Sequence, residues 1–302
     1  MISLCINTQM LLCKHMPRAL YISAGGDHGA YALGMMYAMN TDYTHVGGIS
    51  AGALIAAALA HSGNTRECAQ QMYEMLRSHS MAEPWITQKL GSIVNAVYAL
   101  LFRHSLFQNH IPTLAKPYFD TPMQKTLEVG AYNTTLGRYE TFDETSPYMS
   151  DAVVASASPP AIFSPVLINK CKYSDGAMAH VIPVDEIKAY WKNSKGDVDV
   201  LMCYPTSSLE DFMKCEMTSG LSLQKDMERA TYEMVWNTMQ RDLRELEETF
   251  GPLSGETRVG GRVLRFIRPS KPIYSSFTHP STAAVDAMYQ AGKDAARVQL
   301  RL

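Results

Sequence analysis

The residues best suited to covalent chemistry in this 302-residue sequence form the pentapeptide G-I-S-A-G at positions 48–52. The pentapeptide lies between an apolar segment and a run rich in alanine and leucine, a context that predicts a strand, a tight turn and a helix. The small residues Gly48 and Gly52 allow such a turn, and the following helix N-terminus favours negative charge beside the serine. This nucleophile-elbow pattern favours Ser50 as a nucleophile, and a buried serine turn is the alternative.

A glycine-rich segment precedes the elbow, again between an apolar and a helical stretch. Its residues are Gly25, Gly26, Asp27, His28 and Gly29. A dinucleotide-binding loop would need a glycine where Ala24 stands and an acidic residue about 20 positions further on, which Asp42 does not match. The segment fits an oxyanion loop better, because its glycines can expose backbone N–H groups to a substrate carbonyl. Both turns are expected at the same edge of one sheet.

A third motif, Asp175-Gly176-Ala177, follows a segment rich in alanine, serine and proline at positions 155–165. An Asp-Gly pair alone is an ordinary turn signal. The motif indicates a functional site here because it follows the glycine-rich loop and the nucleophile elbow in the chain.

The elements that must position these motifs alternate between strands and helices. Strands are predicted at 19–23, 45–48, 127–133, 139–142, 200–204 and 263–267, and helices at 30–39, 51–60, 148–156, 223–250 and 282–300. Apolar residues at helical spacing predict a further helix over 90–101, either a core helix or an apolar flap. This alternation predicts an α/β fold with three layers, α/β/α, around a mostly parallel central sheet.

Together the three motifs resemble the patatin-like phospholipases, which are lipid acyl hydrolases. The family pattern is a glycine-rich oxyanion loop, then G-x-S-x-G, then a distant D-G-A or D-G-G, in that order. The resemblance implies that Ser50 is the nucleophile and Asp175 its general base, a dyad without histidine. It also implies an oxyanion held by the backbone amides of Gly25, Gly26 and the residues that follow, and an acyl-enzyme intermediate. The implied activity is phospholipase A-type cleavage of fatty acyl esters of glycerophospholipids.

The sequence departs from the family pattern at two positions of the glycine-rich loop. The family usually has arginine or lysine at the position of His28 and glycine at that of Ala24. Histidine carries a full charge only when it is protonated. Anchoring of the loop, or recognition of a phosphate, is therefore expected to be pH-dependent or weaker.

Two other interpretations stay open. A general carboxylesterase with a Ser-Asp-His triad would use a histidine after the acid, and His180 and His279 are available in that order. A catalytically weak protein of this fold could instead bind lipid or another protein. Labelling by a fluorophosphonate tests the second of these interpretations, because only an activated serine reacts.

Composition limits the partners and the compartment. The formal net charge of −2 excludes the basic excess typical of nucleic-acid binders. The six cysteines form no metal-binding spacing, and the chemistry needs neither metal nor cofactor.

The N-terminus does not fit a secretory signal, and no apolar run approaches the roughly 20 residues of a membrane span. We expect an intracellular protein, soluble or peripherally associated with membrane phospholipid. We further expect residues 1–17 to form an N-terminal leader, whose order the sequence does not define, and residues 18–302 to form a single patatin-like acyl hydrolase domain.

Overall fold

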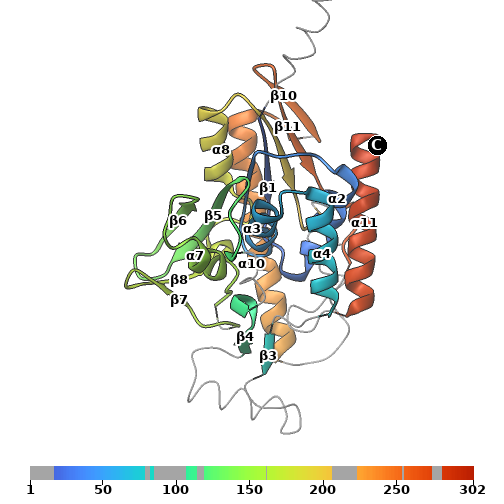
Figure 1. The fold of residues 1–302 in the computed structure, drawn as a ribbon. Coiled ribbons are helices and arrows are strands. Elements are labelled where there is room, and N and C mark those ends of the chain that lie inside the picture. The colour runs from blue at the N-terminus through green and yellow to red at the C-terminus, as the bar shows by residue number, and fades with distance from the viewer. Residues whose placement is uncertain are drawn as a thin grey trace, which may run out of the picture.

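The computed structural model describes residues 17–78, 82–84, 107–113, 119–160, 162–205, 223–253, 255–273 and 281–302. The strands of its main sheet are β1 (Arg18–Ile22), β2 (His45–Gly48), β5 (Thr126–Asn133), β6 (Arg138–Asp143), β7 (Val166–Ile168), β8 (Cys171–Asp175), β9 (Asp197–Leu201), β10 (Glu256–Val259) and β11 (Arg262–Ile267). Their order is β10-β11-β9-β1-β2-β5-β8-β7, with β6 paired to β5 (Figure 1). The strands β3 (Ala82–Pro84) and β4 (Phe107–Asn109) form a separate antiparallel pair.

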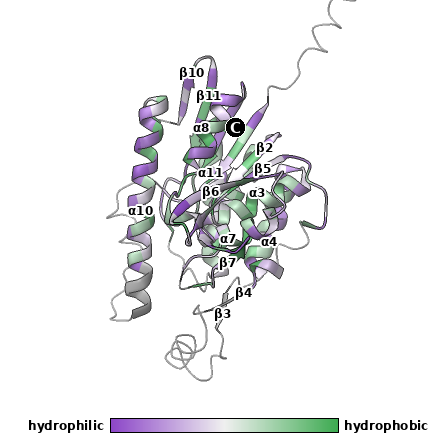
Figure 2. Ribbon diagram, turned by 90° about the vertical axis from the view of Figure 1, so that its left-hand side faces the viewer, coloured by the Kyte–Doolittle hydropathy of each residue, from purple (hydrophilic) through white to green (hydrophobic). Residues whose placement is uncertain are grey.

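Helices cover both faces of this sheet. They are α2 (Gly29–Met39), α3 (Ala51–Ser62), α4 (Thr65–Ser78), α7 (Met149–Ser156), α8 (Val184–Asn193), α10 (Leu223–Phe250) and α11 (Thr282–Leu300), with the 3-10 helices η1 (Gly26–His28) and η3 (Gly176–Met178). In Figure 1, α3 lies in front of the sheet and α10 behind it. Figure 2 shows the layers from the side, with α10 on one side and α3, α4 and α7 on the other. Strands β11, β9, β1, β2 and β5 are parallel. The predicted three-layer α/β/α fold with a mostly parallel central sheet is confirmed.

The register of β5 brings the ends of two strands together. Its residue Val129 pairs with Gly48 of β2 and with Phe142 of β6, so β2 and β6 lie on opposite edges of β5. Two residues further on, Ala131 pairs with Asp175 of β8 and also with β6. Strand β8 therefore lies on the same edge of β5 as β2. Because β2 is parallel and β8 antiparallel to β5, their C-terminal ends face each other along this edge.

Strand β9 is displaced from its predicted position. The apolar run at 200–204 predicts a strand there, whereas β9 spans Asp197–Leu201. The difference arises because Asp199, fully buried, is neutralised inside the sheet. Arg18 Nε lies 3.0 Å from one of its carboxylate oxygens and Arg265 Nε 2.7 Å from the other. Ion pairs from the two neighbouring strands, which are distant from β9 in the sequence, thus permit a buried acidic residue that a hydrophobicity pattern would not predict.

The elements that were not predicted include the strands β3, β4, β7, β8 and β10 and the helix α8. Strand β8 carries the sequence C-K-Y-S-D, without the apolar alternation of a half-buried strand. The predicted helix at 90–101 lies outside the described residues, as do residues 1–16 of the proposed leader.

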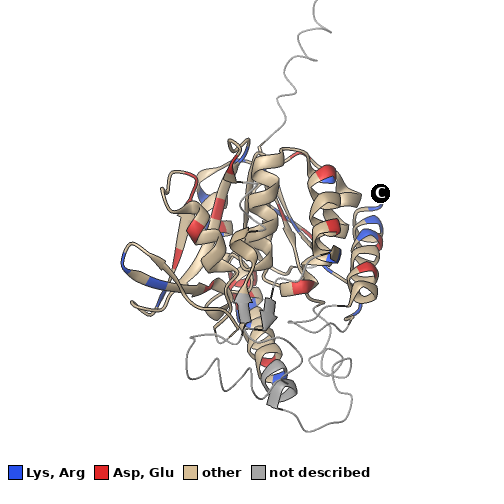
Figure 3. Ribbon diagram, turned by 60° about the horizontal axis from the view of Figure 1, so that its bottom comes forward, with Lys and Arg blue, Asp and Glu red and all other residues tan. Residues whose placement is uncertain are grey.

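The described helices contain no segment long and apolar enough to cross a membrane. Helices α10 and α11 carry acidic and basic residues side by side (Figure 3). This mixture agrees with a net charge near zero.

Candidate active site

Ser50 stands on a strained turn between β2 and α3. Its backbone has φ 58° and ψ −126°. A positive φ of this kind is rare for residues other than glycine and costs about 1–3 kcal/mol. Gly48 and Gly52 allow the turn, because a Cβ atom on Gly48 would overlap the Gly52 backbone, and one on Gly52 would overlap the carbonyl of Ile22. The serine is therefore presented at the N-terminus of α3, where the helix dipole favours negative charge.

The side chain of Ser50 donates a hydrogen bond to Asp175. The distance from Ser50 Oγ to Asp175 Oδ2 is 2.8 Å, between residues 125 positions apart in the chain. Ser50 is 8% exposed and Asp175 2% exposed. The sequence motifs thus meet where β2 and β8 end against β5.

The carboxyl group of Asp175 is held by its own motif. The backbone N–H of Ala177 donates to Asp175 Oδ1 at 2.8 Å, and Gly176 packs against the carbonyl of Gly130. Burial raises the pKa of Asp175 from an ordinary value of 3.8 to about 7, and the bonds from Ala177 and Ser50 oppose this shift. A carboxylate with such a pKa is far better matched to proton transfer at neutral pH than an ordinary aspartate.

The glycine-rich loop connects β1 to α2. Because Ile22 at the end of β1 pairs with Gly48 at the end of β2, the loop lies at the same end of the sheet as the Ser50 turn. Gly26 has φ 53°, a conformation suited to glycine, and Gly29 begins α2. The N–H of Ala24 donates to the carbonyl of Val181 at 2.8 Å and that of His28 to the carbonyl of Gly25 at 2.9 Å. Among the described residues, none accepts a hydrogen bond from the N–H of Gly25 or Gly26. Both amides can therefore serve a ligand oxygen.

His28 is buried within the protein, with only 1% of its surface exposed. Its Nδ1 lies 3.2 Å from Asp27 Oδ1, and its Nε2 lies 3.1 Å from the carbonyl oxygen of Ile273. The ring also packs 4.9 Å from that of Tyr204, centroid to centroid. A bond to a phosphate would have to displace one of these contacts. Of the two roles considered for His28, the contacts support anchoring of the loop.

Of the two histidines considered for a triad, the structure describes His180, and its partner is Asp242 and not Asp175. Its Nδ1 lies 3.0 Å from Oδ1 of Asp242, which is fully buried on α10. Asp242 Oδ2 also accepts the N–H groups of Val181 at 2.6 Å and Ile182 at 3.0 Å. Asp242 therefore fixes the segment that follows η3. The sequence could not identify this residue, because it stands among the many charged residues of α10. His279 lies outside the described residues.

A serine on α7 also escaped the sequence analysis. Ser156, fully buried, accepts a hydrogen bond from the N–H of Ser50 at 3.0 Å and donates one to the carbonyl of Gly130 at 2.6 Å. The alanine-serine-proline segment around it is apparent in the sequence, but nothing in its spacing distinguishes this serine from its neighbours.

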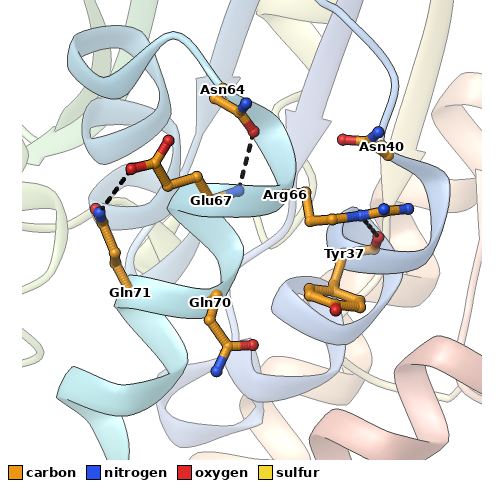
Figure 4. Close-up of a pocket in the computed structure, with 7 residues that line it drawn as sticks. All are labelled: Tyr37, Asn40, Asn64, Arg66, Glu67, Gln70 and Gln71. Atoms are coloured by element: carbon orange, nitrogen blue, oxygen red, sulfur yellow. Dashed lines mark hydrogen bonds between the residues drawn. The ribbon is translucent and has the colours of Figure 1, made fainter.

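A surface pocket of about 390 Å³ lies elsewhere, between the C-terminal end of α2 and the first turns of α4 (Figure 4). Its polar groups bond to one another: Arg66 Nε donates to the carbonyl of Tyr37 at 3.2 Å, and Gln71 Nε2 to Glu67 Oε1 at 3.3 Å. The 11 residues of α2 separate this pocket from the glycine-rich loop by roughly 16 Å. The pocket is separate from the Ser50–Asp175 site.

The fold and this geometry define an α/β protein with a serine at a nucleophile elbow and a buried carboxyl partner. Residues 20–188 match the family model for patatin-like phospholipase, which is more than half of the chain. The chain belongs to the patatin-like phospholipase family. This membership supports lipid acyl hydrolase activity.

Three solved structures are similar to this chain. VipD from Legionella pneumophila is 14% identical with a TM-score of 0.46, covering 94% of this chain and 67% of that one. ExoU, in its complex with SpcU from the type III secretion system of Pseudomonas aeruginosa, is 18% identical with a TM-score of 0.32, covering 77% and 52%. Human GIVD cytosolic phospholipase A2 is 9% identical with a TM-score of 0.34, covering 99% and 62%. The chain thus spans about half to two thirds of their lengths. No curated protein matches it.

Proposed function

We propose that the protein is a phospholipase A-type serine hydrolase that cleaves fatty acyl esters of glycerophospholipids through a Ser50–Asp175 dyad. The observation that carries this proposal is the 2.8 Å hydrogen bond from Ser50 Oγ to the buried carboxyl of Asp175. Family membership supports the lipid substrate class.

In the first half of the reaction, Ser50 Oγ attacks the ester carbonyl carbon while its proton passes to Asp175 Oδ2. The carbonyl oxygen becomes an oxyanion, which the N–H groups of Gly25 and Gly26 and the N-terminus of α3 stabilise. Collapse of this intermediate breaks the ester bond. The leaving alcohol, a lysophospholipid, takes the proton from Asp175, and the acyl group remains on Ser50.

In the second half, Asp175 accepts a proton from water as the water oxygen attacks the acyl-enzyme. The bond between the acyl carbon and Ser50 Oγ then breaks, and Ser50 recovers its proton from Asp175. The products are a fatty acid and the free enzyme. Both halves require Asp175 to begin as a carboxylate.

This requirement predicts a pH dependence for kcat/KM. Because burial raises the pKa of Asp175 to about 7, the carboxylate form is scarce in mildly acidic solution and predominant above neutrality. We expect kcat/KM to rise with pH and level off above pH 7, with roughly a 100-fold deficit two pH units below the pKa. The measurement is a profile of kcat/KM with a neutral ester, with circular dichroism at each pH to verify folding. A flat profile in folded protein would contradict Asp175 as the base.

The substrate proposal predicts a strong dependence on acyl chain length. Each methylene buried beside Ser50 should contribute about 0.8 kcal/mol, which is roughly a fourfold gain in kcat/KM until the acyl site is filled. We would measure a series of esters from butyrate to palmitate. Phospholipid vesicles would then be assayed for released fatty acid and lysophospholipid by mass spectrometry.

The control is Ser50→Ala protein at the same concentration on the same esters and vesicles. A maximum at butyrate together with no release from vesicles would exclude the phospholipase proposal in favour of a general carboxylesterase. It would leave the serine hydrolase proposal intact.

A further inference from the structure

Ser50 needs a support that its own turn does not supply. After β2 ends, the backbone N–H of Ser50 is no longer part of the strand ladder, and the left-handed φ of 58° leads directly into α3. A buried N–H without an acceptor is strongly unfavourable. In this structure the acceptor is the hydroxyl of Ser156, at 3.0 Å.

The other hydrogen bond of Ser156 joins this support to the sheet. Its hydroxyl donates to the carbonyl of Gly130 at 2.6 Å. Gly130 lies on β5 between Val129, which pairs with the end of β2, and Ala131, which pairs with Asp175 at the end of β8. The hydroxyl of Ser156 thus connects the Ser50 turn to Gly130, the position on β5 beside which both β2 and β8 end.

This arrangement differs from the usual behaviour of serine near a helix end. A serine hydroxyl there commonly bonds to the carbonyl four residues earlier. Ser158 does so, donating to the carbonyl of Val154 at 2.7 Å. Ser156 instead bonds 26 residues away to β5 and 106 residues away to Ser50. Its contacts serve the site rather than its own helix.

We propose that Ser156 is a positioning residue for the reaction, whose hydroxyl holds the backbone of Ser50 against β5 so that Ser50 Oγ stays aligned with Asp175. This inference rests on the proposed function, because it assumes that Ser50 is the nucleophile. One consequence is that the N–H of Ser50 is already occupied. The oxyanion must then be bound by other amides, for which those of Gly25 and Gly26 remain free among the described residues.

The test compares Ser156→Ala with wild type and with Thr65→Val. Thr65, the first residue of α4, is also buried, and its hydroxyl donates a hydrogen bond at 2.6 Å to the carbonyl of Thr41, away from Ser50. Thr65→Val therefore removes a buried hydroxyl bond without touching the elbow. For each protein we would measure kcat and KM on one ester, the rate of fluorophosphonate labelling, and the midpoint of thermal unfolding.

We expect Ser156→Ala to lower kcat roughly 100-fold while KM changes less than about twofold, since misalignment of about 1 Å has an effect of this size. The labelling rate should fall in parallel. Thr65→Val should lower the unfolding midpoint but leave kcat unchanged. Ser156→Thr, which retains the hydroxyl, should have a kcat at least about tenfold higher than that of Ser156→Ala.

The proposal is overturned if folded Ser156→Ala keeps wild-type kcat, if Thr65→Val loses as much kcat as Ser156→Ala, or if folded Ser156→Thr recovers nothing. Should Ser156→Ala not fold, Ser156→Cys takes its place, with an expected loss of about tenfold in kcat because a thiol is a weaker hydrogen-bonding group. An unchanged kcat in that variant also overturns the proposal. Mapping the labelled peptide in wild type separates the two levels. No label on Ser50 refutes the proposed function itself, whereas a labelled Ser50 with an unaffected Ser156→Ala variant refutes only the positioning role.

Discussion

Ser50→Ala should reduce ester hydrolysis by roughly 10⁶-fold, as removal of the nucleophile does in other serine hydrolases. The reason is that, in the proposed mechanism, Ser50 Oγ is the atom that forms the acyl-enzyme, and alanine has no group that can replace it. Labelling by a fluorophosphonate should disappear at the same time. The fold should survive, because the change removes one oxygen atom whose described contact is with Asp175. The measurements are kcat/KM, covalent labelling followed by mass spectrometry, and circular dichroism.

The matched control is Ser62→Ala, at the other end of the same helix α3, which should retain activity and labelling. Near-wild-type turnover in folded Ser50→Ala protein would rule out Ser50 as the nucleophile. If wild-type protein is neither labelled nor active on any ester, the lipid-binding or interaction protein replaces the enzyme as the best interpretation.

Asp175→Asn should lower kcat by about 10⁴-fold. Asparagine can still accept the N–H of Ala177, but its amide cannot take the proton from Ser50. The residual activity should also lose the rise with pH that the pKa of Asp175 predicts for wild type. Both effects are measured in one pH profile of kcat/KM for wild type and variant.

The same substitution should stabilise the protein above neutral pH. The pKa of Asp175 is about 7 in the folded state against 3.8 ordinarily, so the folded state holds this proton more tightly. The contribution of Asp175 to stability is therefore fully present below pH 3.8 and is lost as the pH rises to 7. Because a shift of about three units corresponds to about 4 kcal/mol at most, Asp175→Asn should have the larger free energy of unfolding at pH 8. Urea denaturation of both proteins measures this difference, and a variant that is less stable at pH 8 would contradict it.

His180→Ala and His279→Ala provide the comparison for the dyad. Each should retain most activity, since the dyad uses no histidine and His180 contacts Asp242. A loss of several orders of magnitude in either variant would replace the dyad with a triad.

Much of the fold could be predicted because its signals are local. The strand, turn and helix around Ser50 follow from residues within one short stretch, and β1, β2 and β5 are apolar enough to be recognised. Strand β8 was missed because its sequence is polar, and β9 was misplaced because the arginines that neutralise Asp199 come from other strands. Secondary structure that depends on distant partners carries little local signal.

The sequence by itself determined which chemical groups the protein has and in what local setting: a serine on an elbow, glycines that can expose amides, and an aspartate in an Asp-Gly-Ala motif. The tertiary structure alone decided that β2 and β8 end face to face on one edge of β5, which brings Ser50 Oγ within 2.8 Å of Asp175 across 125 residues. It also decided that Ser156 supports the turn and that burial raises the pKa of Asp175. These properties depend on strand register and on a low-dielectric interior, and neither exists until distant parts of the chain have packed together.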